Sequence, residues 1–151
     1  MTQEDKQLLL KDLCARLPYG VCVHIRYKEG EPCYGELTPK DIQWFIDSKI
    51  KEIKPYLRPM SSMTEEEIKE YNDIVKNTID FYNCPKSEEI CFFITPINWL
   101  NAHHFDYRGL IEKDLAIEEP EGMYDTSQKW TTIRSELKEN ENGQIVGGLK
   151  L

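Results

Sequence analysis

The sequence predicts an α+β fold in which a small, strongly bent antiparallel sheet packs against helices. Apolar residues alternate with polar ones over residues 21–25, as in a strand with one buried face. Apolar residues recur every three to four positions over residues 65–82, as on an amphipathic helix. A length of 151 residues suits one domain. We expect this domain to span residues 1–138 and to be followed by a flexible tail over residues 139–151.

The chain begins with a predicted helix over residues 3–17. Thr2 and Asp5 have the spacing of a capping box, with Asp in place of the more usual Glu. Four leucines then recur at helical spacing, and Pro18 ends the run.

A hairpin is predicted next. The loop at residues 28–32 contains Gly and Pro, and it separates the alternating strand from a returning strand over residues 33–37. A further apolar stretch over residues 50–57 completes the sheet, which is therefore predicted within residues 19–57.

The intervening segment, residues 38–46, carries two conflicting signals. Thr38 followed by Pro39 and Asp41 is typical of a helix start. Residues 42–46, however, are rich in the β-branched and aromatic residues that favour strands. We weigh composition above the cap and predict a strand.

The second half of the chain predicts more helices. Thr64 and Glu67 form a capping box at the start of the helix predicted over residues 65–82, with acidic residues in its first turn. Thr95 and Pro96 have the pattern of a second helix start, which predicts a helix over residues 96–104.

Three further segments complete the chain. Residues 90–94 form a short apolar run that indicates a buried strand. After Ile117 the composition becomes acidic, and Pro120 and Gly122 indicate a turn. Residues 125–138 have apolar residues at helical spacing and are compatible with one more helix.

Composition and charge limit the class of protein. The net charge is −8, which argues against nonspecific nucleic-acid binding because that requires clustered Lys and Arg. The five cysteines include no pair spaced as Cys-x-x-Cys, which favours free thiols in a reducing compartment. The acidic start does not resemble a signal peptide, and no apolar run is long enough to span a bilayer. We therefore expect a cytoplasmic protein without a membrane partner.

Residues 99–111 hold the greatest concentration of chemically informative side chains. A metal-dependent hydrolase could use His103, His104 and Asp106. Adjacent helical side chains diverge by about 100°, however, so two neighbouring histidines rarely bind one ion. Packing or helix capping is the simpler interpretation of these histidines, and we expect no resident metal, no cofactor and no catalytic residue.

The same segment contains the ingredients of a recognition site. Tyr107 and Arg108 are of the residue types that dominate binding hot spots. The Pro-interrupted segment 54–63 adds an apolar strip flanked by basic residues. Joined, the two segments provide nine candidate binding residues: Trp99, His103, His104, Asp106, Tyr107, Arg108, Lys54, Tyr56 and Arg58. If both segments line one cavity, binding is favoured, and if both pack inward, these residues are chiefly structural.

Three blocks of the sequence, residues 12–21, 53–67 and 97–111, resemble a family of short hypothetical proteins encoded by phages and mobile elements of gut-associated bacteria. The resemblance covers about residues 8–124, whereas residues 125–151 depart from the family pattern. It implies a setting in the cytoplasm of a host bacterial cell and brings no established activity.

The expected function is therefore that of a non-catalytic accessory protein of a phage or mobile element. Its partner would be a host protein or a small-molecule ligand. Binding to such a partner could act against a defence system of the host. One alternative is a sponge for a nucleotide signal, in which Trp99 or Tyr107 stacks on the base and Arg108 holds phosphate with Lys54 or Arg58. The other alternative is the metal-dependent hydrolase. The oligomeric state is left open, with a homo-oligomer among the alternatives.

Overall fold

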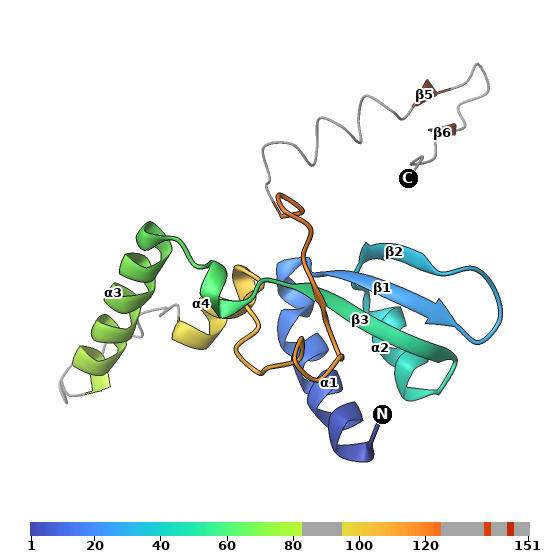
Figure 1. Cartoon of the computed structure of the whole chain (residues 1–151), viewed down its shortest axis with the longest axis horizontal. Helices are drawn as coiled ribbons and strands as arrows, with labels where there is room; N and C mark the ends of the chain where they lie inside the picture. Colours follow the sequence, from blue (N-terminus) through green and yellow to red (C-terminus); the bar gives the residue numbers. More distant parts are fainter. Residues whose placement is uncertain (83–94, 125–137, 140–144, 147–151) are drawn as a thin grey trace. The chain divides into compact units, whose positions relative to one another are not determined.

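The computed structural model of this chain describes residues 1–82, 95–124, 138–139 and 145–146. The chain divides into two compact units, Met1–Glu118 and Glu119–Leu151. The first unit has the predicted α+β class, and its described residues form a four-stranded sheet and four α-helices (Figure 1). The division lies where the sequence becomes acidic after Ile117.

Helix α1 spans Gln3–Arg16 and closely matches its predicted range. The capping box is present, because Thr2 accepts a hydrogen bond from the Asp5 N–H and the Asp5 carboxylate accepts one from the Thr2 N–H. A short 3-10 turn follows α1 and ends at Gly20, whose φ of 67° suits glycine. The chain thereby turns from α1 into the sheet.

The sheet has the order β2-β1-β3-β4. Strand β1 (Cys22–Tyr27) pairs antiparallel with β2 (Cys33–Glu36) and with β3 (Ile50–Leu57), as predicted. The two-residue strand β4 (Ile117–Glu118) pairs parallel with the end of β3, so the sheet is mixed and not wholly antiparallel.

One face of this sheet is covered by α1 and α2 (Figure 1). Buried positions alternate along β1, where Val23 and Ile25 are almost fully buried. In β3, Ile53 is almost fully buried, and the last three residues of the strand are buried in succession. Leu9 and Leu13 of α1 are also fully buried and complete this core. Burial of such side chains contributes roughly 1.5–3 kcal/mol each to folding.

The strand predicted over residues 38–46 is wrong, because Pro39–Ile46 forms helix α2. Thr38 and Asp41 make both hydrogen bonds of a capping box. Ile42 and Phe45 lie three positions apart and are both buried, which places β-favouring residues on the apolar face of a helix. Tertiary packing and the cap together override intrinsic strand preference here.

Helix α3 spans Glu65–Tyr82, as predicted, and a 3-10 turn at Met60–Ser62 leads into it. Helix α4 spans Pro96–Ala102 and is two residues shorter than predicted. It ends early because His104 adopts a left-handed conformation with φ of 60°, which cannot continue a helix.

Two predicted elements, the strand over residues 90–94 and the helix over residues 125–138, fall wholly or almost wholly outside the described residues. In the second unit, β5 (Lys138–Glu139) and β6 (Ile145–Val146) form an antiparallel pair. Within the described part of the chain, no helix has the length and apolarity needed to cross a membrane.

The cap of α2 gives a first prediction. Replacing Thr38 with Ala removes the acceptor for the Asp41 N–H, and we expect it to lower the free energy of unfolding by about 0.5–2 kcal/mol. Urea unfolding followed by circular dichroism measures this loss. The matched control is Ser61→Ala, which removes an exposed hydroxyl that caps no helix. Equal losses in both variants would show that the cap does not hold α2.

Candidate functional site

The predicted recognition residue Trp99 belongs to the core. It is 2% exposed and forms a cluster with Leu100 and Phe105. Its indole stacks on the ring of His103 at 4.0 Å between centroids and lies 5.6 Å from the ring of Tyr71 on α3. Trp99 therefore holds α4 against α3 and does not offer a free stacking surface.

The three side chains of the hydrolase hypothesis serve the fold. His103 places Nδ1 2.9 Å from the carbonyl oxygen of Trp99. Both carboxylate oxygens of Asp106 accept backbone N–H groups, from Leu110 and Ile111, at 2.9 Å. His104 is buried in its left-handed conformation. Throughout the described residues, no group of three His, Cys, Asp or Glu side chains converges as a metal site would require.

The two segments that hold the predicted binding residues, 54–63 and 99–111, lie next to each other, and backbone hydrogen bonds join them. The Arg58 N–H donates to the carbonyl of His104 at 2.8 Å, and the Asp106 N–H donates to the carbonyl of Arg58 at 2.7 Å. The Arg58 guanidinium lies over the ring of Phe105 at 4.2 Å. The same guanidinium binds both carboxylate oxygens of Glu67, at 2.7 and 2.9 Å. Arg58 thus fastens β3, α3 and the segment after α4 together.

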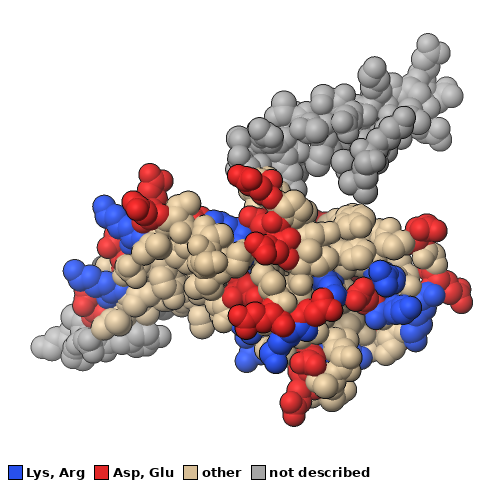
Figure 2. Space-filling view, viewed as in Figure 1, with Lys and Arg blue, Asp and Glu red and all other residues tan. Residues whose placement is uncertain are grey.

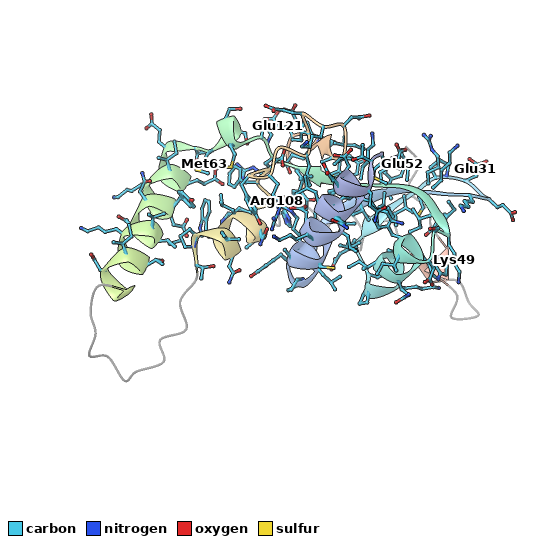
Figure 3. The ribbon with its side chains drawn as sticks, turned by 90° about the horizontal axis from the view of Figure 1, so that it is seen from below. Glu31, Lys49, Glu52, Met63, Arg108 and Glu121 are labelled. Carbon is cyan, nitrogen blue, oxygen red and sulfur yellow. The ribbon has the colours of Figure 1, made fainter. Side chains whose placement is uncertain are left out.

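A buried ionic network holds the remaining pair, Tyr107 and Arg108. Arg16 and Asp12 on α1 are fully buried, and Arg16 Nε donates to Asp12 at 2.7 Å. Arg16 Nη2 also donates to the carbonyl of Phe105 at 2.7 Å. Arg108 donates from Nε to the second oxygen of Asp12 and from Nη2 to the Tyr107 hydroxyl. Figure 3 shows Arg108 where the segment after α4 approaches α1.

The last two candidates, Lys54 and Tyr56, lie on β3. Lys54 donates to Asp114 at 2.7 Å and lies 3.5 Å from Glu52, and the hydrogen bond to Asp114 raises the pKa of Lys54. Tyr56 is buried, and burial raises the pKa of its phenol. Six of the nine candidate residues, namely Trp99, His103, His104, Asp106, Tyr107 and Arg58, are thus engaged in packing, helix termination or backbone bridging. Arg108, Lys54 and Tyr56 are held by ionic contacts or burial.

Asp12 and Arg16 were not among the residues predicted from the sequence to form the site. The available signal was their spacing of four on a predicted helix, which permits a salt bridge. Nothing in the sequence relates Arg16 to Phe105, which lies 89 positions later.

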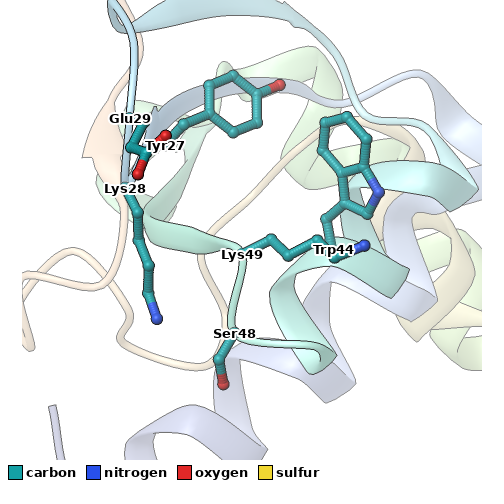
Figure 4. A pocket seen from close by; sticks show the side chains of 6 residues that line it. All are labelled: Tyr27, Lys28, Glu29, Trp44, Ser48 and Lys49. Atoms are coloured by element: carbon teal, nitrogen blue, oxygen red, sulfur yellow. The ribbon is translucent and has the colours of Figure 1, made fainter.

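An open pocket lies where β1, α2 and β3 come together (Figure 4). Its volume is about 570 Å³, within the range of small-molecule sites. Tyr27, Lys28 and Glu29 line one side from the end of β1, and Trp44 of α2 lies opposite, with Ser48 and Lys49 between them. We call this the Trp44 pocket.

Two aromatic rings form the wall of the Trp44 pocket. Tyr27 meets Trp44 edge to face, with 5.8 Å between centroids. Tyr27 is also hydrogen-bonded to the thiol of Cys33, which with burial raises the pKa of Tyr27 to about 12. The phenol is therefore neutral at physiological pH.

Lysines surround the indole of Trp44. The ammonium of Lys40 lies 4.3 Å from the ring centroid and that of Lys49 lies 6.0 Å from it. Lys28 lines the pocket from the β1 side, and Glu29 is the one acidic residue among the described residues that line it. Figure 2 shows basic side chains gathered among acidic ones at the right-hand end of the described unit.

Local backbone geometry presents these side chains. The register between β1 and β3 shifts between Arg26 and Tyr27, which marks a bulge beside the pocket. The Lys49 N–H donates to the carbonyl of Trp44 at 2.9 Å, and Ser48 has a φ of 58°. Trp44 was not predicted as a site residue because residues 38–46 were predicted to form a strand, in which Lys40 and Trp44 are not neighbours. On a helix, a separation of four brings them together.

Comparison of the chain with known proteins does not assign it to a family. No protein-family model matches the chain, and neither the curated proteins nor the solved structures give a significant match.

The Arg58–Glu67 pair gives a second prediction. Its hydrogen bonds lower the pKa of Glu67 from an ordinary 4.5 to about 2. A carboxylate with a depressed pKa stabilises the fold above pH 4.5 and loses this effect as the pH falls toward 2. Glu67→Gln keeps an acceptor for the Thr64 N–H but loses the charge. We expect it to lower the free energy of unfolding by about 1–3 kcal/mol at pH 7.

Urea unfolding between pH 7 and pH 3 measures this effect. The difference between the original protein and Glu67→Gln should shrink as the pH falls below 4.5. A difference that is constant with pH would show that the charge of Glu67 is not what stabilises the contact.

The buried network gives a third prediction. Asp12→Asn leaves the buried guanidinium of Arg16 without its counter-charge, and we expect a loss of about 3–5 kcal/mol in the free energy of unfolding. Arg108→Gln removes a partly exposed partner and should cost only about 1 kcal/mol. Chemical denaturation measures both. The opposite ranking would contradict the central place of the Asp12–Arg16 pair.

Proposed function

We propose that this protein acts by binding and not by catalysis, and that its ligand is a small anion bearing a planar ring, of which a nucleotide is the representative class. The observation that carries the proposal is the Trp44 pocket, which is lined by an aromatic wall and two lysines, Lys28 and Lys49, in a chain with a net charge of −8. A third lysine, Lys40, lies over the indole of Trp44. The aromatic and basic chemistry expected of a nucleotide sponge is thus present, but at residues other than Trp99, Tyr107 and Arg108.

The ligand class follows from the two kinds of group in the pocket. Stacking of a planar base on an aromatic side chain contributes roughly 1–3 kcal/mol. The lysine ammoniums already lie near the indole, and an exposed cation–π contact is worth only about 0.5–1 kcal/mol. A ligand ring can therefore replace a lysine on the indole, and the released ammonium can bind the ligand's phosphate or carboxylate.

A binding role also agrees with the structural contacts that the three histidines make. His103 and His104 are held by Trp99 and by burial, and His24 stacks on Tyr34 with 4.8 Å between ring centroids. Covalent catalysis by Ser or Cys requires a base within hydrogen-bonding distance of the nucleophile. The His103 imidazole lies instead within hydrogen-bonding distance of a backbone carbonyl, and the His24 imidazole is stacked on a tyrosine ring.

The resemblance to phage and mobile-element proteins suggests where such binding would act. In the cytoplasm of a bacterial host, a small protein that sequesters an anionic signal would weaken any host response that depends on that signal. This accessory role, with a defence system as the affected response, is the biological setting that we propose.

Titration with adenosine 5′-monophosphate tests the proposal. We expect the ligand to quench tryptophan fluorescence and to raise the melting temperature, since binding to the native state stabilises it. Trp44→Leu should abolish the quenching, which assigns the signal to Trp44 among the three tryptophans. Adenosine and inorganic phosphate, each tested alone, should bind more weakly than the monophosphate because each offers only half of the interaction.

Matched charge variants complete this experiment. Lys49→Gln should weaken binding by about fivefold, the effect of losing one exposed ion pair. Lys69→Gln removes the same charge from an exposed position on α3 and should leave binding unchanged. Absence of quenching by the monophosphate and by the corresponding guanosine, cytidine and uridine compounds would refute the proposal.

A further inference from the structure

A second cleft lies along β3, away from the indole of Trp44. Its volume is about 370 Å³, and it is bounded by the start of α1, by β3 and by the segment that precedes β4. The floor is apolar and consists of Leu9, Ile53 and Leu115, all of them buried. We call it the Lys51 cleft.

Charged side chains form the rim of the Lys51 cleft. The acidic members are already engaged: Asp5 caps α1, Glu52 lies near Lys54 and Arg26, and Asp114 accepts from Lys54. The basic residues Lys51 and Lys113 also line the cleft. Within the described residues Lys51 has no ion pair or hydrogen bond, and Lys113 has only a longer-range attraction to Asp5. The charge left over at this rim is therefore positive.

The backbone of β3 at the cleft also has hydrogen-bonding groups that are not paired with another strand of the described chain. Strand β4 pairs only with Tyr56 and Leu57 at the end of β3. Before Tyr56, the described part of the chain supplies no strand on this side of β3. The same stretch of β3 borders the cleft, so a ligand there meets an open strand edge.

We propose that the Lys51 cleft binds a carboxylate attached to a short apolar group. The apolar group covers Leu9, Ile53 and Leu115, and the carboxylate lies between Lys51 and Lys113. Three acidic residues on the rim disfavour a dianion, which selects a carboxylate over a phosphate monoester. A free aliphatic acid and the carboxyl terminus of an extended peptide share this chemistry, and the open edge of β3 suits the peptide.

The test is a titration of the full chain followed by two-dimensional ¹H–¹⁵N NMR. The probes are octanoate, octyl phosphate and an acetylated tetrapeptide that ends in leucine, the last as free acid and as carboxamide. We expect saturable shifts at the amides of Leu9, Ile53 and Leu115 with octanoate and with the free-acid peptide. The carboxamide should bind about tenfold or more weakly, because hydrogen bonds to a carboxylate exceed neutral ones. Octyl phosphate should also bind more weakly than octanoate, because the acidic residues of the rim repel a dianion.

Charge variants identify the residues that bind the carboxylate. Lys51→Gln and Lys113→Gln should each weaken binding of octanoate by about threefold to fivefold, the scale of an exposed ion pair. Lys69→Gln on α3 is the matched control and should bind as the original protein does. These three lysines are exposed, so the variants should fold, and unchanged NMR spectra outside the cleft confirm it.

The peptide arm separates the two sources of the carboxylate. Tighter binding of the free-acid peptide than of octanoate assigns the cleft to a chain terminus, whereas the reverse assigns it to a free aliphatic acid. Equal binding of acid and carboxamide, or weakening by Lys69→Gln as large as by Lys51→Gln, would overturn the proposal. The outcome is independent of the Trp44 pocket, because Trp44→Leu should leave these shifts unchanged.

Discussion

The first unit depends most on the hydrogen bonds that the fully buried guanidinium of Arg16 donates to Asp12 and to the carbonyl of Phe105. This guanidinium connects α1 to the carbonyl of Phe105, a residue 89 positions later, and shares Asp12 with Arg108. Burying these charges is costly unless each is paired and hydrogen-bonded, so the network tolerates little displacement of its members. It therefore fixes where the segment after α4 lies on α1, and through this segment it also fixes the contact with β3.

This constraint explains why the most chemically rich part of the sequence is structural. Residues 99–108 stack on one another, end α4 and bridge to Arg58 of β3. The side chains of His103, Asp106 and Arg108 make hydrogen bonds inside the fold, and they do not converge on one point. The two pockets for which we propose ligands, the Trp44 pocket and the Lys51 cleft, are lined instead by residues of β3 or next to it. Both combine an apolar surface with lysines in an otherwise acidic chain, and both lie next to irregular sheet features, a bulge in one case and an unpaired edge in the other.

Much of the fold was predictable because its signals are local. Capping boxes at Thr2 and Thr64, and apolar residues at helical spacing, predicted α1 and α3 almost to the residue. Alternation predicted the hairpin of β1 and β2. Segment 38–46 was predicted wrongly because its cap and its composition conflict, and only packing of Ile42 and Phe45 into the core decides between them. The parallel pairing of β4 could not be predicted, since a two-residue strand has no pattern of its own.

The candidate site also separates features that the local sequence determines from features that only tertiary packing determines. The sequence by itself determined the α+β class, the positions of three of the helix starts and the residue types available for recognition, because these depend on neighbours in the chain. Which aromatic residue is buried and which lies beside a pocket was decided by tertiary structure alone. Trp99 and Trp44 both follow a Thr-Pro helix start, yet one stacks on His103 in the core and the other borders an open pocket with Tyr27. The physical reason is that burial depends on what the rest of the chain places against a side chain, and those contacts join residues far apart in sequence.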